Sequence, residues 1–505
     1  MAILGRVVKV TAALLTSNVV NLVTRLLLPP LFLYRYGATL YGEWLALSGA
    51  VAYLSTLNFG IQTYITQDLV IRYQQKDMVS YHLRQSTALR LLLGILGGAA
   101  LVALLVFALP VKSLLRLTVS QSMAVWTLYF LALQVLLTVL FGYFTGIYTV
   151  LSRAHTGVLW VNGQRLCMVL LVSLGAWRRW SFPVLAACQL GIYAVGVMLI
   201  LLHIRRIAPE IFPQLSSWDG SAARSMLQPS GYFGLISLST FLSFEVPIVL
   251  LQRETGPVIV VAFTVMRTIF SMSRQILISP TQALSQEIIR LFANREWVDL
   301  ARVYAYSERI LFTFIPVVNL GILLISPVLL VVWLHKPSLF RVLPYVLCAA
   351  VSMTLSAKEH KFQFQFATNT HERLARIMFF SYIALDVASI LMVWWYGMVG
   401  FLIAWLAVEL YQVARLIQLN QELLKPSGEH TLSYVYRLVG LAALGLAASA
   451  MLLRHTYVAP YWMQFAMAFG FCWIIGGVGY FLFDMQGIAQ MLYGKLSRHI
   501  GLAKT

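Results

Sequence analysis

The chain is dominated by apolar segments that are each long enough to cross a lipid bilayer as a helix. A helical span needs about 20 mostly apolar residues, and such segments recur along all 505 residues with only short connectors between them. Hydrophobic residues make up 60% of the chain and charged residues 11%, which is far from the balance of a soluble domain. Because lipid cannot satisfy backbone polar groups, these segments must be helices. The sequence therefore predicts an all-α polytopic membrane protein.

About 14 transmembrane helices are predicted from the positions of these segments. Lys and Arg are concentrated in alternate connectors, with about 20 on one side of the membrane and about nine on the other. Because Lys and Arg favour the cytoplasmic side, both termini are expected to be cytoplasmic. The expected spans are residues 8–33, 42–66, 86–109, 122–150, 157–177, 183–203, 229–252, 257–282, 304–331, 341–367, 374–396, 398–420, 432–453 and 461–483.

Two amphipathic connectors, residues 66–84 and 282–302, resemble each other. Each carries a basic–acidic pair, Lys76-Asp77 in the first and Arg295-Glu296 in the second, and the two pairs lie 219 positions apart. This repeat predicts two pseudo-symmetric six-helix lobes that enter the membrane from the same side. The alternative is a chance recurrence of interfacial helices. The expected domains are an N-lobe at 1–205 (spans 1–6), a cytoplasmic linker at 206–228, a C-lobe at 229–425 (spans 7–12), and spans 13–14 with a cytoplasmic tail at 426–505.

The first span carries a polar stripe inside an otherwise apolar helix. Asn18, Asn21 and Arg25 fall on one helical face, within the apolar stretch 11–30. An arginine inside a span costs at least about 2.5–3.5 kcal/mol, so it must face protein or water. We expect the rest of the chain to complete a wet cavity around this stripe. The alternative is that Arg25 lies near the end of the span and reaches the lipid headgroups.

Further cations lie inside later spans, each on one helical face with other polar residues. Arg165 lies in the fifth span, Arg267 and Arg274 in the eighth, and Lys358 and Lys361 in the tenth. Few acids balance them, so the interior is expected to be net positive. Such a cavity suits phosphate or pyrophosphate, which arginine can bind through two hydrogen bonds at once. For the two lysines, the alternative is a location near the cytoplasmic surface.

The acids noted inside spans are Glu245 in the seventh, Asp386 in the eleventh and Glu409 in the twelfth, with Glu359 beside Lys358 in the tenth. An ionisable residue at membrane depth is a candidate cation or proton site that couples transport. The alternative is an ion pair with a nearby arginine. Pro247, two residues after Glu245, frees a backbone carbonyl that could help to coordinate a cation.

Several kinds of chemistry lack their usual residues in this sequence. There is no paired-acid motif for a sugar donor and no Walker A motif, and the four cysteines show no metal or disulfide spacing. The net charge of +19 follows membrane topology and does not indicate nucleic-acid binding. The sequence thus favours a transporter over an enzyme, with no cofactor or metal site. Its energy would come from an ion gradient, Na⁺ or H⁺, or from the substrate gradient.

Short motifs give the chain a resemblance to a known family. Tyr41-Gly42-Glu43-Trp44 is followed by Leu57-Asn58-Phe59-Gly60, and in the second lobe Glu245 is followed by Gly256 and Val261-Ala262-Phe263. These motifs and the connector after the eighth span resemble bacterial repeat-unit flippases for O-antigen and capsule, the polysaccharide biosynthesis transporters. That family is part of the multidrug/oligosaccharidyl-lipid/polysaccharide exporter superfamily. Asn58 and Glu245 each stand where the family often has Asp.

The resemblance implies alternating access in the bacterial cytoplasmic (inner) membrane. The cargo would be an undecaprenyl-pyrophosphate-linked oligosaccharide, flipped to the outer leaflet for O-antigen lipopolysaccharide or exopolysaccharide export. In the related peptidoglycan-lipid flippase, arginines of helices 1 and 8 line the cavity, and Arg25, Arg267 and Arg274 stand in the same helices here. That relative has a sodium site in helices 7, 11 and 12, which here contain Glu245, Asp386 and Glu409.

Two other functions remain open from the sequence alone. One is a multidrug extruder of the same superfamily, although a site for organic cations would have more interior acids than bases. The other is a membrane subunit of a polysaccharide synthase or polymerase complex. The expected partners of a flippase are the lipid-linked oligosaccharide, membrane lipids and other polysaccharide-assembly proteins.

Overall fold

The described part of the chain is helical and contains no strand. The computed structural model describes residues 2–58, 61–151, 153–368, 370–427, 433–456 and 459–487. Within these ranges a number of side chains are not described, including those of residues 2–15, Asn18 and Asn58. The chain divides into two compact units, Met1–Val261 and Ala262–Thr505.

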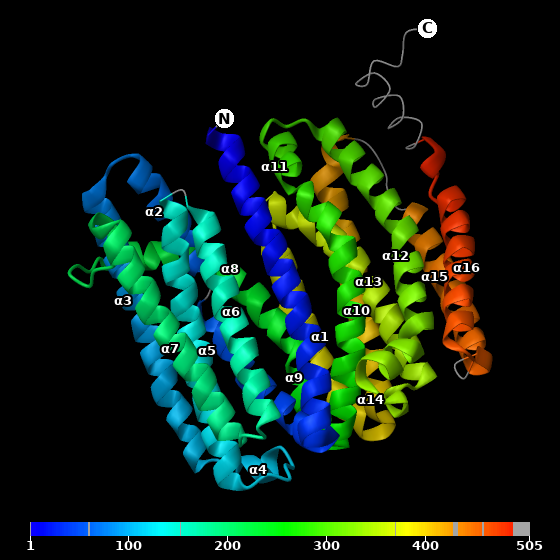
Figure 1. Ribbon diagram of the computed structural model, residues 1–505. Helices are drawn as coiled ribbons and strands as arrows, with labels where there is room; N and C mark the ends of the chain where they lie inside the picture. The colour runs from blue at the N-terminus through cyan, green and yellow to red at the C-terminus, as the bar shows by residue number, and fades with distance from the viewer. Residues whose placement is uncertain are drawn as a thin grey trace. The chain divides into compact units, whose positions relative to one another are not determined.

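The first unit begins with a long helix, α1, that bends nearer its C-terminal end (Figure 1). Gly37 adopts φ +77° at the bend, a conformation that glycine adopts without strain. Two apolar stretches that the sequence assigns to separate spans therefore meet at this residue. The elements of this unit are α1 (Ala2–Val51), η1 (Ala52–Asn58), α2 (Ile61–Gln74), α3 (Met78–Ala103), η2 (Leu104–Ala108), α4 (Val111–Leu114), α5 (Gln121–Val150), α6 (Ala154–Trp177), α7 (Phe182–Ile207), η3 (Pro209–Ile211), α8 (Gly220–Phe244) and α9 (Val246–Thr255).

The second unit contains another pair of apolar stretches joined at a glycine. Gly397, at φ +56°, bends the long helix α14, and the predicted eleventh and twelfth spans lie on either side of the bend. The elements are α10 (Pro257–Ala283), whose first residues belong to the first unit, α11 (Ser285–Ala293), α12 (Trp297–Leu334), η4 (Pro337–Leu339), α13 (Val342–Ala367), α14 (Glu372–Leu424), η5 (Lys425–Ser427), α15 (Ser433–Thr456) and α16 (Tyr461–Leu482).

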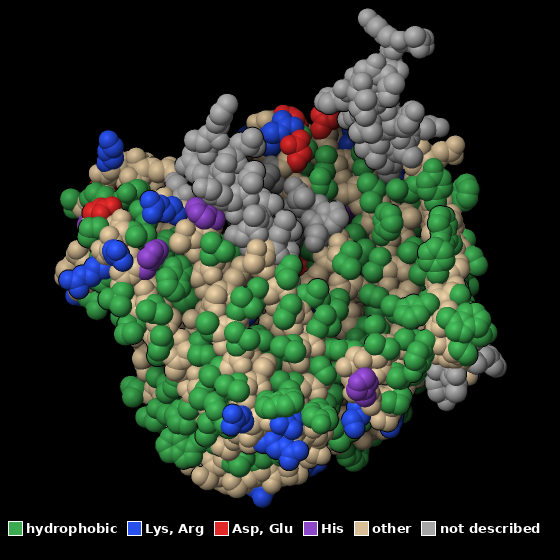
Figure 2. Space-filling model, in the orientation of Figure 1, with side chains coloured by type: hydrophobic (Ala, Val, Ile, Leu, Met, Phe, Trp, Pro, Cys, Tyr) green, Lys and Arg blue, Asp and Glu red, His purple; other side chains and the backbone are tan. Residues whose placement is uncertain are grey.

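Ten of the described helices are long and apolar enough to cross a membrane, so the chain is a multi-pass membrane protein. Hydrophobic side chains cover the middle of the visible face, and charged side chains gather toward the ends of the helices (Figure 2). Expected spans such as 122–150 and 157–177 coincide with single helices, α5 and α6. The count of fourteen and the cytoplasmic termini stay predictions, and residues 488–505 lie outside the described part.

The two similar connectors form the same turn in both units. Lys76 and Arg295 each adopt φ +59°, and the acid that follows each of them is the N-cap of the next helix, Asp77 for α3 and Glu296 for α12. The sequence repeat therefore has a structural counterpart at these positions. The first compact unit ends at Val261, whereas the sequence predicts a linker between the lobes at 206–228. Helices α8 and α9 belong to the first unit because they contact α1, α2 and α3. The repeat of whole lobes stays a prediction.

Candidate functional site

A polar seam joins α1 to α6 in the first unit. The Ser17 hydroxyl donates a hydrogen bond to Asn162 Oδ1 at 2.7 Å, and one turn further on the Arg165 guanidinium donates to Asn21 Oδ1. Both helices present polar residues at helical spacing, so their stripes meet face to face. The structure thus brings together Asn21 and Arg165, which the sequence names separately. The Asn18 side chain lies outside the described residues.

Among the described residues, no acid neutralises Arg165 in this seam. Its acceptor is the neutral amide oxygen of Asn21, which satisfies a donor without neutralising the guanidinium. Arg25 lies one turn beyond Asn21 on the same face of α1 and is half-buried. It is not isolated, because it interacts with a neighbouring group. The seam therefore holds two half-buried arginines, Arg25 on α1 and Arg165 on a helix long and apolar enough to cross a membrane.

A second pair of arginines lies on α10, in the second unit. Arg267 places its guanidinium 5.6 Å from the centre of the Phe263 ring, within the range of a cation–π contact. Arg267 and Arg274 are both half-buried, and both interact with neighbouring groups. Seven residues, about two turns, separate them, so they share one face of the helix. Convergence of these arginines with Arg25 stays a prediction, because it joins the two units.

Lys358 lies in a closed network between α13 and α14. Its ammonium donates to Glu409 Oε2 at 2.5 Å and to the Tyr382 hydroxyl at 2.6 Å. Glu409 also accepts bonds from the Tyr382 hydroxyl and from the Trp405 indole nitrogen. Lys358 is 4% exposed and Glu409 0%. This geometry gives Lys358 a carboxylate partner where the sequence suggests an open anion site.

Lys361, one turn further along α13, has a network of its own with α12. Its ammonium donates to Glu308 Oε1 and, at 2.8 Å, to the Tyr304 hydroxyl. Lys361 and Glu308 are buried. Glu308 is not among the predicted site residues, although it lies within the predicted ninth span. Both lysines are thus ion-paired and enclosed, so the second unit is less positive inside than expected. We assign them the role of joining α12, α13 and α14.

The three candidate ion-coupling acids lie in different surroundings. Glu409 is ion-paired with Lys358, so the lysine ammonium already occupies the position where a coupling cation would bind. The Asp386 carboxylate on α14 is buried and has no hydrogen-bond partner among the described residues. The Ser389 hydroxyl, one turn away, is also buried without such a partner. Glu245 lies where α8 ends and α9 begins. Its carboxylate makes no hydrogen bond or ion pair to the described residues and lies 3.4 Å from where a Cβ on Gly49 would be.

The motif at residues 41–44 builds structure in the first unit. Tyr41 and Trp44 are buried with the Phe32 ring between them. The fully buried Glu43 accepts hydrogen bonds from two successive backbone N–H groups, those of Thr118 and Val119, just before α5. The sequence shows this motif but not its role, because the partner of Glu43 lies 75 residues away.

Comparisons with known proteins find similarity in structure only. No family model matches the chain and no curated protein matches it in sequence. An inward-facing multidrug resistance MATE family transporter of the MOP superfamily aligns with a TM-score of 0.67 and 14% identity, over 81% of this chain and 96% of that one. The lipid II flippase MurJ, in an inward closed conformation, aligns with a TM-score of 0.65 and 11% identity, over 95% and 100%.

A MOP superfamily transporter from Pyrococcus furiosus aligns with a TM-score of 0.57 and 14% identity, over 84% of this chain and 96% of that one. At such low identity the likeness establishes the fold, which is that of MOP-superfamily transporters. The nearly complete coverage of these chains means that the fold is shared along most of its length. The substrate does not follow from this likeness.

Proposed function

We propose that the protein is a transporter that moves an undecaprenyl-pyrophosphate-linked oligosaccharide from the inner to the outer leaflet of the bacterial cytoplasmic membrane. The shared fold supports transport by alternating access. The observation that carries the substrate class is the set of half-buried arginines within the predicted spans, Arg25 and Arg165 in one unit and Arg267 and Arg274 in the other. Guanidinium groups bind pyrophosphate oxygens through paired, charge-assisted hydrogen bonds.

The two units have separate parts in this proposal. In the first unit, the seam of α1 and α6 offers a charged guanidinium beside amide and hydroxyl groups, which suits phosphate and sugar oxygens alike. In the second unit, α10 presents Arg267 and Arg274 on one face. The ion-paired lysines of α13 hold the helices behind this face and do not bind the substrate. The prenyl tail would stay in the lipid.

Multidrug extrusion is the second candidate, since structures of MATE transporters share the fold. A pocket for organic cations would be lined by unpaired acids. Glu409 and Glu308 are each neutralised by a lysine, whereas Asp386 and Glu245 have no ion pair among the described residues. We propose that these two acids serve Na⁺ or H⁺ coupling.

Export of surface glycan in cells tests the proposal. Arg25→Ala and Arg267→Ala should each lower export strongly, and Arg267→Glu should abolish it, at unchanged protein level in the membrane. Arg302→Ala is the matched control, because Arg302 is exposed at the start of α12 and, among the described residues, pairs only with Asp299 on its own helix. Normal export by both alanine variants would overturn the proposal. Drug resistance conferred on a hypersensitive host, with no effect on glycan, would favour extrusion.

A further inference from the structure

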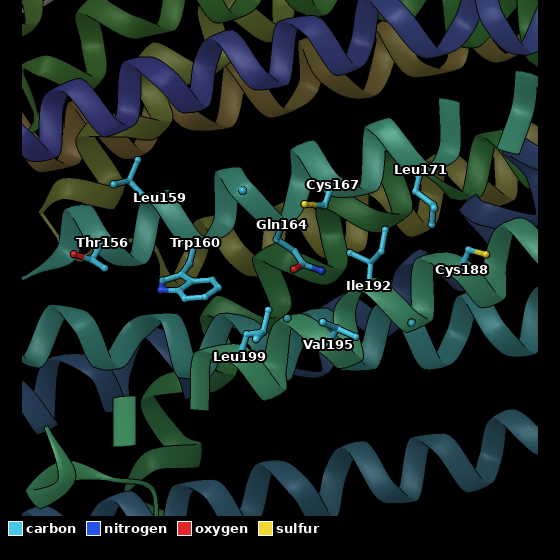
Figure 3. A pocket seen from close by; sticks show the side chains of 13 residues that line it. Thr156, Leu159, Trp160, Gln164, Cys167, Leu171, Cys188, Ile192, Val195 and Leu199 are labelled. Atoms are coloured by element: carbon cyan, nitrogen blue, oxygen red, sulfur yellow. The ribbon is translucent and has the colours of Figure 1, made fainter. Parts of the chain in front are cut away.

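A groove runs between α6 and α7 on the surface of the first unit (Figure 3). Its volume is about 680 Å³, within the range of about 300–1,000 Å³ typical of ligand sites. The walls are almost wholly apolar, with Leu159 and Leu171 from α6 and Ile192 and Val195 from α7. No part of the proposed transport mechanism uses this groove.

Glycines leave the groove open. Gly163 and Gly191 are exposed, and a Cβ on either would meet no heavy atom within 4 Å. Gly196 is different, because a Cβ there would lie 2.3 Å from Gln164 Oε1. The Gln164 carboxamide thus covers Gly196 and forms the floor of the groove, while the space above the other two glycines stays free.

The rim of the groove faces lipid. Leu159, Val195 and Leu199 are 50%, 51% and 44% exposed, on two helices that are long and apolar enough to cross a membrane. Apolar side chains exposed on such helices contact hydrocarbon. The material that fills the groove in a bilayer is therefore a hydrocarbon chain, and the question is which lipid supplies it.

On α6 the groove reaches the beginning of the helix, whereas on α7 it stops at Leu199, eight residues before α7 ends at Ile207. It begins at Thr156, two residues into α6, and stops at Leu171, six residues before α6 ends at Trp177. At 1.5 Å per residue this is a length of about 22 Å, comparable to one leaflet with its interface. The lipid would therefore have its headgroup at the end where α6 begins.

Cations surround that end. Arg153 is the N-cap of α6, and Arg205 and Arg206 lie in the last turn of α7; all three are exposed. The Trp160 and His203 rings, 5.7 Å apart, hold the two helix ends together beside them. Basic residues between helix ends on the cytoplasmic side bind anionic lipid headgroups, and Trp prefers the interface.

We propose that this groove binds one acyl chain of an anionic phospholipid, with its phosphate at Arg153, Arg205 and Arg206. The Lys and Arg distribution predicts that this is the cytoplasmic leaflet. The site is separate from the polar seam, because Asn162 and Arg165 point from α6 toward α1 whereas Gln164 and Cys167 line the groove (Figure 3). The inference therefore does not depend on the proposed transport function.

Gln164 gives the proposal a sharp internal test. Its side chain is 8% exposed, and its Nε2 has no hydrogen-bond partner among the described residues. A hydrocarbon chain offers that donor no acceptor, so Gln164→Leu should leave lipid binding unchanged or tighter. A polar ligand, or a helix of another protein, would use the amide, and the same variant would then bind it more weakly.

The occupant can be measured by native mass spectrometry of the full chain, with phosphatidylglycerol as the probe. Filling the groove with Gly163→Leu and Gly191→Leu should weaken binding at least about tenfold, since each excluded methylene contributes about 0.8 kcal/mol. The matched control is Gly94→Leu with Gly97→Leu in α3, two exposed glycines where a Cβ also meets nothing within 4 Å. Equal binding by the filled and control proteins would overturn the proposal.

The headgroup is tested by competition between phosphatidylglycerol and phosphatidylcholine. Arg205→Gln with Arg206→Gln should remove the preference for the anionic lipid, whereas Arg178→Gln with Arg179→Gln, exposed at the other end of α6, should keep it. If only the Arg178→Gln, Arg179→Gln protein lost the preference for phosphatidylglycerol, the lipid would lie in the opposite leaflet and the assignment would be refuted. Displacement of phosphatidylglycerol by an equal concentration of undecaprenyl phosphate would also refute it, in favour of an isoprenoid chain.

Discussion

Replacing Lys361 with methionine should destabilise the second unit more than any comparable change on its surface. The Lys361 and Glu308 side chains are each 1% exposed, so the variant would leave a carboxylate buried without its ammonium. Removing one partner of a buried ion pair costs about 3–5 kcal/mol. Methionine keeps most of the volume of the lysine stem, so little of this cost would come from a cavity. The Tyr304 hydroxyl would lose its bond from the ammonium as well.

The double variant Lys361→Met with Glu308→Leu isolates the electrostatic part of this cost. Apolar replacement of both partners is often neutral or stabilising, so the double variant should unfold within about 1 kcal/mol of the wild type. The assay is equilibrium unfolding in mixed micelles, followed by tryptophan fluorescence. Arg302→Met, which breaks an exposed pair with Asp299, should cost less than about 1 kcal/mol. Equal destabilisation by the single and double variants would refute the buried ion pair.

Three further predictions concern other parts of the chain. Gly42→Ala should destabilise the first unit by about 1–3 kcal/mol or more, because its Cβ would lie 2.2 Å from the Pro257 carbonyl oxygen; normal thermal stability would contradict that close approach. Hydrogen bonds from Ser80 hold the pKa of Asp77 below its usual range, so this N-cap stabilises α3 above the ordinary carboxyl pKa and is lost as the pH falls through the lowered value. Asp77→Ala should therefore speed amide exchange in the first turn of α3 at neutral pH, and the difference from the wild type should vanish in acid. Asp386→Asn should remove the dependence of transport on Na⁺ or pH with no loss of stability, because the carboxylate has no described partner to lose; unchanged ion dependence would remove Asp386 from the coupling site.

Local sequence patterns were sufficient for the helices and for the polar stripes. Length and hydropathy located α5, α6 and α7, and the repeated pairs Lys76-Asp77 and Arg295-Glu296 coincide with two turns of the same geometry. Helical spacing placed Asn21 and Arg25 on one face of α1. These features depend on residues within one or two turns of each other, which is why the sequence shows them directly.

Partners that are distant in sequence were beyond this reasoning. Spacing puts Lys358 and Lys361 on one side of α13, but it does not show that Glu409 and Glu308, more than 50 residues away in opposite directions, lie against them. A cation inside a span therefore looks the same in sequence whether it awaits a ligand or already has a carboxylate. The groove between α6 and α7 could not be predicted either, because the glycines that line it follow no recognisable spacing in the sequence.

The central claim is that arginines at membrane depth bind the pyrophosphate of a lipid-linked oligosaccharide. The most direct measurement is flipping of a fluorescent undecaprenyl-pyrophosphate oligosaccharide in proteoliposomes that contain the purified chain. The account predicts flipping by the wild type and by Arg302→Ala, strong loss in Arg25→Ala and Arg267→Ala, and inhibition by soluble pyrophosphate. Equal flipping by all four proteins, with no effect of pyrophosphate, would contradict it.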